Sequence, residues 1–140
     1  MKKIILMGRS TAGKTTLTQA LRGEVIHKDK TQAVQYYSDI IDTPGEYTQV
    51  THLVSALATY AYEADIVGLV IAANEIYSVY PPNITCSVNR EVIGIITKID
   101  KEDANVELAK LRLKLTGCKK IFQVNSKEGI GITELLEYLA

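Results

Sequence analysis

Near its start the chain carries the sequence Gly8-Arg9-Ser10-Thr11-Ala12-Gly13-Lys14-Thr15, which matches the phosphate-binding pattern GxxxxGK[ST] at every fixed position. A short apolar run, residues 3–7, comes directly before it. A stretch with helical character, residues 14–22, follows and stops at Gly23. The pattern therefore predicts a buried strand, a glycine loop and a helix, in that order.

The residue types in this loop suit a nucleotide phosphate. Glycines let the backbone curl so that its N–H groups face one anion, and the helix N-terminus adds its positive dipole end. We expect Lys14 to neutralise the β- and γ-phosphates and the Thr15 hydroxyl to complete a Mg²⁺ shell. An ordinary glycine-rich turn explains the full match less well. The predicted contacts are Gly8, Arg9, Ser10, Thr11, Ala12, Gly13, Lys14, Thr15 and Thr16.

A second motif, Asp42-Thr43-Pro44-Gly45, ends an apolar stretch at residues 36–41 that we predict to be one strand. Taken alone, Asp-x-Pro-Gly is typical of a β-turn. After a phosphate loop it has a further meaning, because a carboxylate at this strand end can hold Mg²⁺ through water. The Gly45 amide is then a candidate sensor of the γ-phosphate.

A third motif, Thr97-Lys98-Ile99-Asp100, follows a strand predicted at residues 92–96. The Lys98 stem can lie over a base, and Asp100 can accept hydrogen bonds from N1–H and N2–H₂ of guanine, a pair of donors that adenine lacks. We include Thr97 among the candidate base contacts, with Ser126, whose amide could reach guanine O6, and the adjacent Lys127. The competing interpretation is a solvated charged turn.

The remaining pattern alternates strands with helices, which implies parallel pairing and right-handed crossovers. We expect one α/β domain over residues 1–140, with a mainly parallel sheet covered by helices on both faces. The other predicted helices are residues 49–63, 104–115 with Asp103 as N-cap and Gly117 beyond the end, and 133–139; the other strands are residues 66–72 and 121–124.

Charge and hydropathy narrow the classes of partner. Sixteen basic residues balance sixteen acidic ones, and no Lys/Arg block favours nucleic acid. No stretch approaches the ~20 apolar residues of a spanning helix, and no lipid-anchor signature is present. These features predict a cytoplasmic protein without a membrane anchor.

The three motifs, in this order, resemble the Ras-like GTPases of the translation-factor-related class over the whole chain. A closer resemblance is to the EutP/PduV family, through MGRSTAGKTTLTQAL, KTQAV, IIDTPGEY and VIGIITKID. It implies a three-layer P-loop (Ras-like) fold, GTP or GDP with Mg²⁺, and an accessory role in ethanolamine or propanediol utilisation. Microcompartment shell proteins or associated enzymes are the implied partners. Members resemble both GTPases and acetate kinases, so ATP stays an alternative nucleotide.

Several residues depart from the general GTPase pattern. Thr31 is the candidate switch I threonine and Mg²⁺ ligand beside Thr15 and Asp42. Because only ten residues separate Thr31 from Asp42, we expect the second strand to be shortened or missing. Glu46 replaces a water-positioning glutamine and is, with Lys14, a candidate catalytic residue or else a solvated helix start. A slow GTPase, an acetate kinase and a nucleotide-binding adaptor without turnover all remain open.

Overall fold

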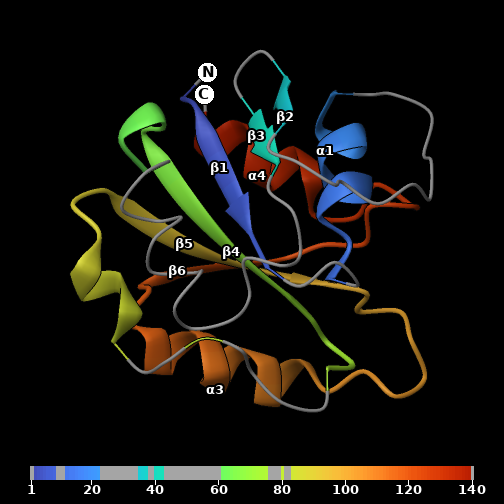
Figure 1. The fold of residues 1–140 in the computed structure, drawn as a ribbon. Coiled ribbons are helices and arrows are strands. Elements are labelled where there is room, and N and C mark those ends of the chain that lie inside the picture. The colour runs from blue at the N-terminus through green and yellow to red at the C-terminus, as the bar shows by residue number, and fades with distance from the viewer. Residues whose placement is uncertain are drawn as a thin grey trace.

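The computed structural model describes residues 2–8, 12–22, 35–37, 40–42, 61–75, 80 and 83–139. Within them lies a sheet of six strands in the order β2-β3-β1-β4-β5-β6. Figure 1 shows these elements. The strands are β1 (Ile4–Met7), β2 (Gln35–Tyr37), β3 (Ile40–Asp42), β4 (Ile66–Ala72), β5 (Glu91–Thr97) and β6 (Lys120–Gln123). The helices are α1 (Lys14–Arg22), η3 (Ala61–Glu63), η4 (Ile84–Ser87), α3 (Val106–Thr116) and α4 (Ile132–Leu139).

The sheet is parallel except at one edge, where β2 runs antiparallel to β3. The prediction of one strand over residues 36–41 is wrong, because Tyr37 pairs with Ile40 across two separate three-residue strands. The second strand is thus present and short, as the spacing between Thr31 and Asp42 led us to expect. Ser38 and Asp39 belong to residue types that favour turns, and they were the available signal for a hairpin.

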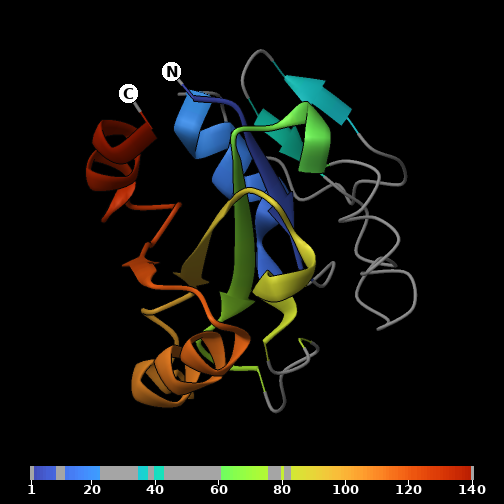
Figure 2. The ribbon, with the colours of Figure 1, turned by 90° about the vertical axis from the view of Figure 1, so that its left-hand side faces the viewer.

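Helices cover both faces of the sheet, as predicted. Along β1, Ile4 and Leu6 join the core formed with α1 and α4, whereas Ile5 and Met7 join the core formed with α3 and η4. Figure 2 shows α3 lying across the molecule from α1 and α4. β1 and β4 are buried along their whole length, which fits strands packed on two sides.

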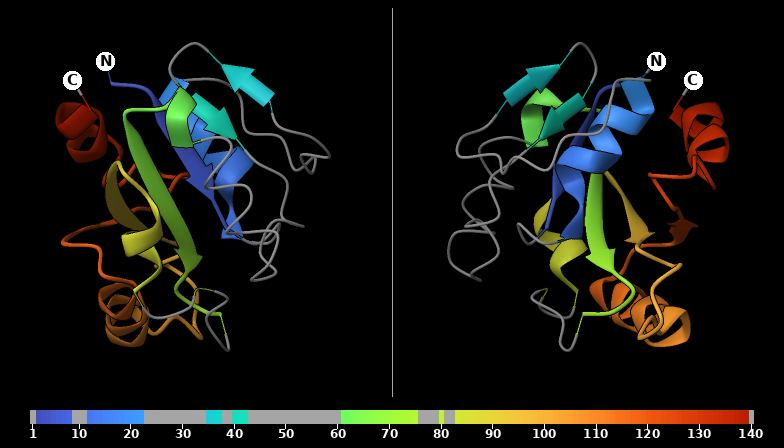
Figure 3. Two further views of the ribbon diagram at one scale, coloured as in Figure 1. Left: turned by 60° about the vertical axis from the view of Figure 1, so that its left-hand side comes forward. Right: turned by 90° about the vertical axis from the view of Figure 1, so that its right-hand side faces the viewer.

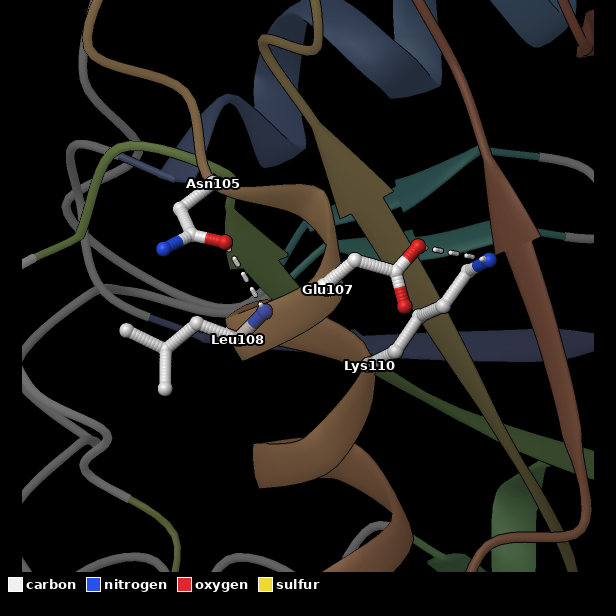
Figure 4. A network of polar contacts seen from close by, with 4 residues as sticks. All are labelled: Asn105, Glu107, Leu108 and Lys110. Atoms are coloured by element: carbon white, nitrogen blue, oxygen red, sulfur yellow. Dashed lines mark hydrogen bonds and ion pairs between the residues drawn. The ribbon is translucent and has the colours of Figure 1, made fainter.

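α3 begins two residues later and ends one residue later than the predicted helix at residues 104–115. Its N-cap is Asn105, whose side chain accepts a hydrogen bond of 3.1 Å from the amide of Leu108 (Figure 4), so the predicted cap at Asp103 is wrong. Both residue types cap helices, and the one next to the first helical residue does so here. Gly117 ends the helix in a left-handed conformation, φ 101°, as expected.

The two ends of the described chain meet, since the Lys2 amide donates to the Leu139 carbonyl at 2.6 Å (Figure 1). Of the helix predicted at residues 49–63, only the last three residues are described, and they form the short helix η3. None of the helices in the described part of the chain has the length and apolar character that crossing a membrane requires.

Candidate functional site

The predicted motifs gather where the parallel strands end. Register pairs join Leu6 to Asp42 and Ala72 to Thr97, so the carboxyl ends of β1, β3, β4 and β5 lie along one edge of the sheet. β6 ends at the same edge, shortly before Asn125. Figure 3 shows these strand ends from two sides. In open α/β sheets this edge is where ligands bind, so the topology brings the phosphate loop and the base motif together.

The described part of the phosphate loop is held by its own lysine. Lys14 has only 3% of its surface exposed, and its Nζ donates a hydrogen bond of 2.6 Å to the Gly8 carbonyl. Gly13 has φ 87°, which glycine adopts without strain. Helix α1 begins directly after Gly13, because the Leu17 amide donates to the Gly13 carbonyl at 2.9 Å. The two described ends of the loop are thus fastened to each other; Arg9, Ser10 and Thr11 lie outside the described residues.

Thr97 connects the base motif to the phosphate loop. Its hydroxyl donates a hydrogen bond of 2.5 Å to the Ala12 carbonyl, and both residues are buried. A hydroxyl has one proton, so this bond uses the only donor that Thr97 could offer a base and leaves its oxygen lone pairs. This linkage across 85 positions is a feature that sequence reasoning missed.

Lys98 lies beside the phosphate loop with a left-handed backbone, φ 56°. Its Cε would be 3.9 Å from a Cβ placed on Gly13, so the stem passes close to the loop. Partial burial lowers the pKa of Lys98, the positive charges of Lys101 and Lys127 lower it further, and the Glu75 carboxylate opposes them. Lys101 and Lys127 are therefore near enough to repel the charge of Lys98, and an anionic ligand would relieve that repulsion.

The segment after β6 holds buried polar atoms with unmet hydrogen-bonding capacity. Asn125 is 3% exposed and its Oδ1 accepts from the Glu128 amide at 3.4 Å, but its Nδ2 has no partner among the described residues. The Ser126 hydroxyl oxygen is likewise buried and without a partner in that set. Such atoms are costly to leave unpaired, so a polar partner from outside the described residues would stabilise this segment. The Asp100 side chain is exposed at this edge, as is that of Lys127.

Residue types whose oxygen atoms suit Mg²⁺ stand on two described elements. Thr15 and Thr16 are half-buried in the first turn of α1, and Asp42 is the last residue of β3, beside β1. Mg²⁺ prefers hydroxyl, carboxylate and phosphate oxygens and keeps several waters, so a small set of protein ligands fits it. Thr31, Gly45 and Glu46 lie outside the described residues.

The family described as ethanolamine utilisation - propanediol utilisation, PduV-EutP, matches residues 1–140. This chain belongs to the PduV-EutP family. The propanediol utilization protein PduV of Citrobacter freundii is 42% identical over 140 residues, which cover 99% of this chain and 93% of that protein. The probable acetate kinase EutP of Escherichia coli (strain K12) is 36% identical, over 100% of this chain and 90% of that protein.

A solved structure extends the comparison to the fold. The Methanosarcina barkeri protein Roco2 RocCORdC, bound to GDP, matches with a TM-score of 0.64 and 20% identity. The match covers 99% of this PduV-EutP chain but only 47% of that one. It confirms the predicted α/β, Ras-like P-loop fold.

Proposed function

We propose that this PduV-EutP family protein binds GTP and GDP with Mg²⁺ through one domain, residues 1–140, and hydrolyses GTP slowly. The observation that carries the proposal is the hydrogen bond from Thr97 to Ala12, because it joins the base motif to the phosphate loop. A single nucleotide can then contact both. The GDP bound by the Roco2 structure supports a guanine nucleotide.

Each predicted residue has a role in this proposal. The backbone amides of residues 8–16 and the Lys14 ammonium hold the phosphates, with the Gly45 amide near the γ-phosphate. Thr15, Asp42 and Thr31 supply oxygens to Mg²⁺, which would draw charge from the phosphates when bound. Asp100 accepts from guanine N1–H and N2–H₂, and the contacts around the base come from Lys98, Ser126 and Lys127, while Thr97 joins the base motif to the phosphate loop.

Slow turnover follows from what the site supplies. Fast hydrolysis needs an oriented water and an additional cation on the transition state. Glu46 is a carboxylate where a neutral glutamine would orient water, and no arginine among the residues that the structure describes is assigned to the cation's role. Unassisted enzymes of this type turn over at roughly 10⁻⁴ to 10⁻² per second, and we expect a rate near the slow end.

The second candidate function is an acetate kinase, favoured by the name of the Escherichia coli relative. In that reaction the nucleotide's γ-phosphoryl group passes to an acetate oxygen instead of water, and the nucleotide is ATP or GTP. The third is an adaptor that binds nucleotide without turnover. For all three, we place the protein in the cytoplasm at a bacterial microcompartment, with shell proteins or associated enzymes as partners in ethanolamine or propanediol utilisation.

The nucleotide that co-purifies with the protein, identified by chromatography after denaturation, tests the choice of base. Single-turnover hydrolysis of GTP with and without acetate then separates the reactions. Acetyl phosphate formed faster than free phosphate would overturn the GTPase and establish the kinase. Glu46→Gln should leave hydrolysis unchanged or faster, whereas a rate lower by about a hundredfold would identify Glu46 as a general base.

A further inference from the structure

The hydroxyl of Tyr80 bridges β1 and β4 where the two strands separate. Tyr80 is 7% exposed, and its oxygen lies 2.8 Å from the Met7 carbonyl oxygen and 2.7 Å from that of Val70. Met7 and Leu69 form the last register pair between these strands. One hydroxyl proton is therefore shared by two backbone acceptors just beyond the point where strand pairing ends.

The same hydroxyl lies against the first residue of the phosphate loop. A Cβ placed on Gly8 would be 3.1 Å from the Tyr80 oxygen and 2.6 Å from the Val70 carbonyl oxygen, so only glycine fits here. The Gly8 carbonyl in turn accepts the hydrogen bond from Lys14. A continuous set of contacts thus runs from Tyr80 through Met7 and Gly8 to the lysine that faces the predicted phosphate site.

The environment keeps this hydroxyl in its donor form. Burial raises the pKa of Tyr80 well above its ordinary value, and the negative charge of Glu75 adds to the rise, while the bond to Val70 opposes both. The phenol therefore stays protonated over the whole physiological range. A neutral donor in contact with two carbonyl oxygens avoids the repulsion that a phenolate would meet there.

We propose that Tyr80 is a positioning residue for the phosphate loop, which sets the Met7–Gly8 backbone and through it the place of the Lys14 ammonium. The inference rests on the proposed nucleotide-binding function. Tyr80 belongs to the buried core cluster that also contains Met7, Leu69 and Ile84, and packing in that core alone would require only an aromatic ring. The hydroxyl is what distinguishes a positioning residue from a packing residue.

Tyr80→Phe keeps the ring and removes the hydroxyl. We expect the affinity for GDP and GTP to fall about tenfold, the factor for one buried hydrogen bond. In nucleotide-free protein, amide hydrogen exchange should become faster at Gly8 and at residues 12–15. The matched control is Tyr138→Phe, which loses a hydroxyl bonded to Glu91 at the other end of β5. That variant should keep wild-type affinity and wild-type exchange in the loop.

Two results would overturn the inference. The first is that wild type binds GDP and the Tyr80→Phe variant binds it with the same affinity. The other is a lower Tm without faster exchange at Gly8 and residues 12–15, which would make Tyr80 a packing residue only. If wild type binds no guanine nucleotide, the proposed function fails, and the exchange measurement on nucleotide-free protein still decides the role of Tyr80.

Discussion

The phosphate side and the base side of the candidate site differ in how their polar groups are paired. On the phosphate side, Lys14, Thr97 and Tyr80 each donate to a backbone carbonyl of β1 or of the loop that follows it. On the base side, Asn125 Nδ2 and Ser126 Oγ are buried without a partner among the described residues. The phosphate loop is thus shaped by the protein itself, while the base side keeps hydrogen-bonding capacity for a ligand. The first arrangement favours affinity for a nucleotide, and the second favours discrimination between bases.

The largest effect should come from Lys14→Ala. We expect nucleotide affinity to fall by about a thousandfold, because two charge-assisted hydrogen bonds to phosphate are worth roughly 3–6 kcal/mol together. The fold should survive, since the hydrogen bond from Lys14 to the Gly8 carbonyl is made within the loop itself. Titration calorimetry with GDP measures the affinity, and thermal melting measures the stability of the fold.

The matched control is Lys110→Ala, which removes a lysine paired at 3.6 Å with Glu107 on α3 (Figure 4). It should change neither the affinity for GDP nor, by more than about 0.5 kcal/mol, the free energy of unfolding. Wild-type affinity in Lys14→Ala would remove the phosphate loop from the function.

The next largest effect concerns the base side. Asp100→Asn should weaken GTP binding by roughly a hundredfold, because two hydrogen bonds to a carboxylate are lost. It should strengthen XTP binding, since the new amide can donate to the oxygen that xanthine carries at C2. Competition binding with GTP, XTP and ATP gives all three affinities. The control is Asp103→Asn, which changes an exposed aspartate between β5 and α3 and should leave the three affinities unchanged. Equal binding of ATP and GTP by wild type would contradict a guanine-specific site.

The strand ends that carry this candidate site could be predicted from the sequence, but the contacts that shape it could not. Asp42 and Thr97 were predictable because each follows an apolar strand and parallel strands end at one edge. The sequence predicts a base contact at Thr97 and carries no signal for a role of the Tyr80 hydroxyl. The hydrogen bonds of Tyr80 and Thr97 span 73 and 85 positions, to Met7 and Ala12, and no local pattern encodes contacts over such separations. The division of residues 36–41 between two strands was missed because the apolar residues on either side of Ser38 and Asp39 resemble one strand.

A moderate effect should follow from Thr97→Val, which tests the link between the two sides. Valine keeps the β-branched shape but leaves the buried Ala12 carbonyl without its donor, at a cost of about 1–2 kcal/mol. Affinities for GDP and XDP should fall by the same factor, roughly fivefold to tenfold, because the loop and not the base is affected. Thr97→Ser restores the hydroxyl and should recover most of the loss. A change confined to one base would show that Thr97 contacts the base directly.

The smallest effect should appear in Lys98→Gln. The pKa of Lys98 is lowered in the folded protein by partial burial and by the positive charge of Lys101, so the charged form opposes folding at neutral pH. Without nucleotide, the variant should be more stable than wild type at pH 7 by a few tenths of a kcal/mol.

The pH dependence follows from the direction of the shift in the pKa of Lys98. Between the lowered folded value and the ordinary 10.5, the unfolded chain binds more protons, so wild-type stability rises with pH. The advantage of Lys98→Gln should therefore shrink as the pH rises through that range. With saturating GDP at pH 7 the order should reverse, because the lysine then faces an anionic ligand. Denaturant unfolding of both proteins from pH 7 to 10, with and without GDP, measures the difference in their free energies of unfolding. If that difference changes neither with pH nor with GDP, the Lys98 charge faces solvent and not the site.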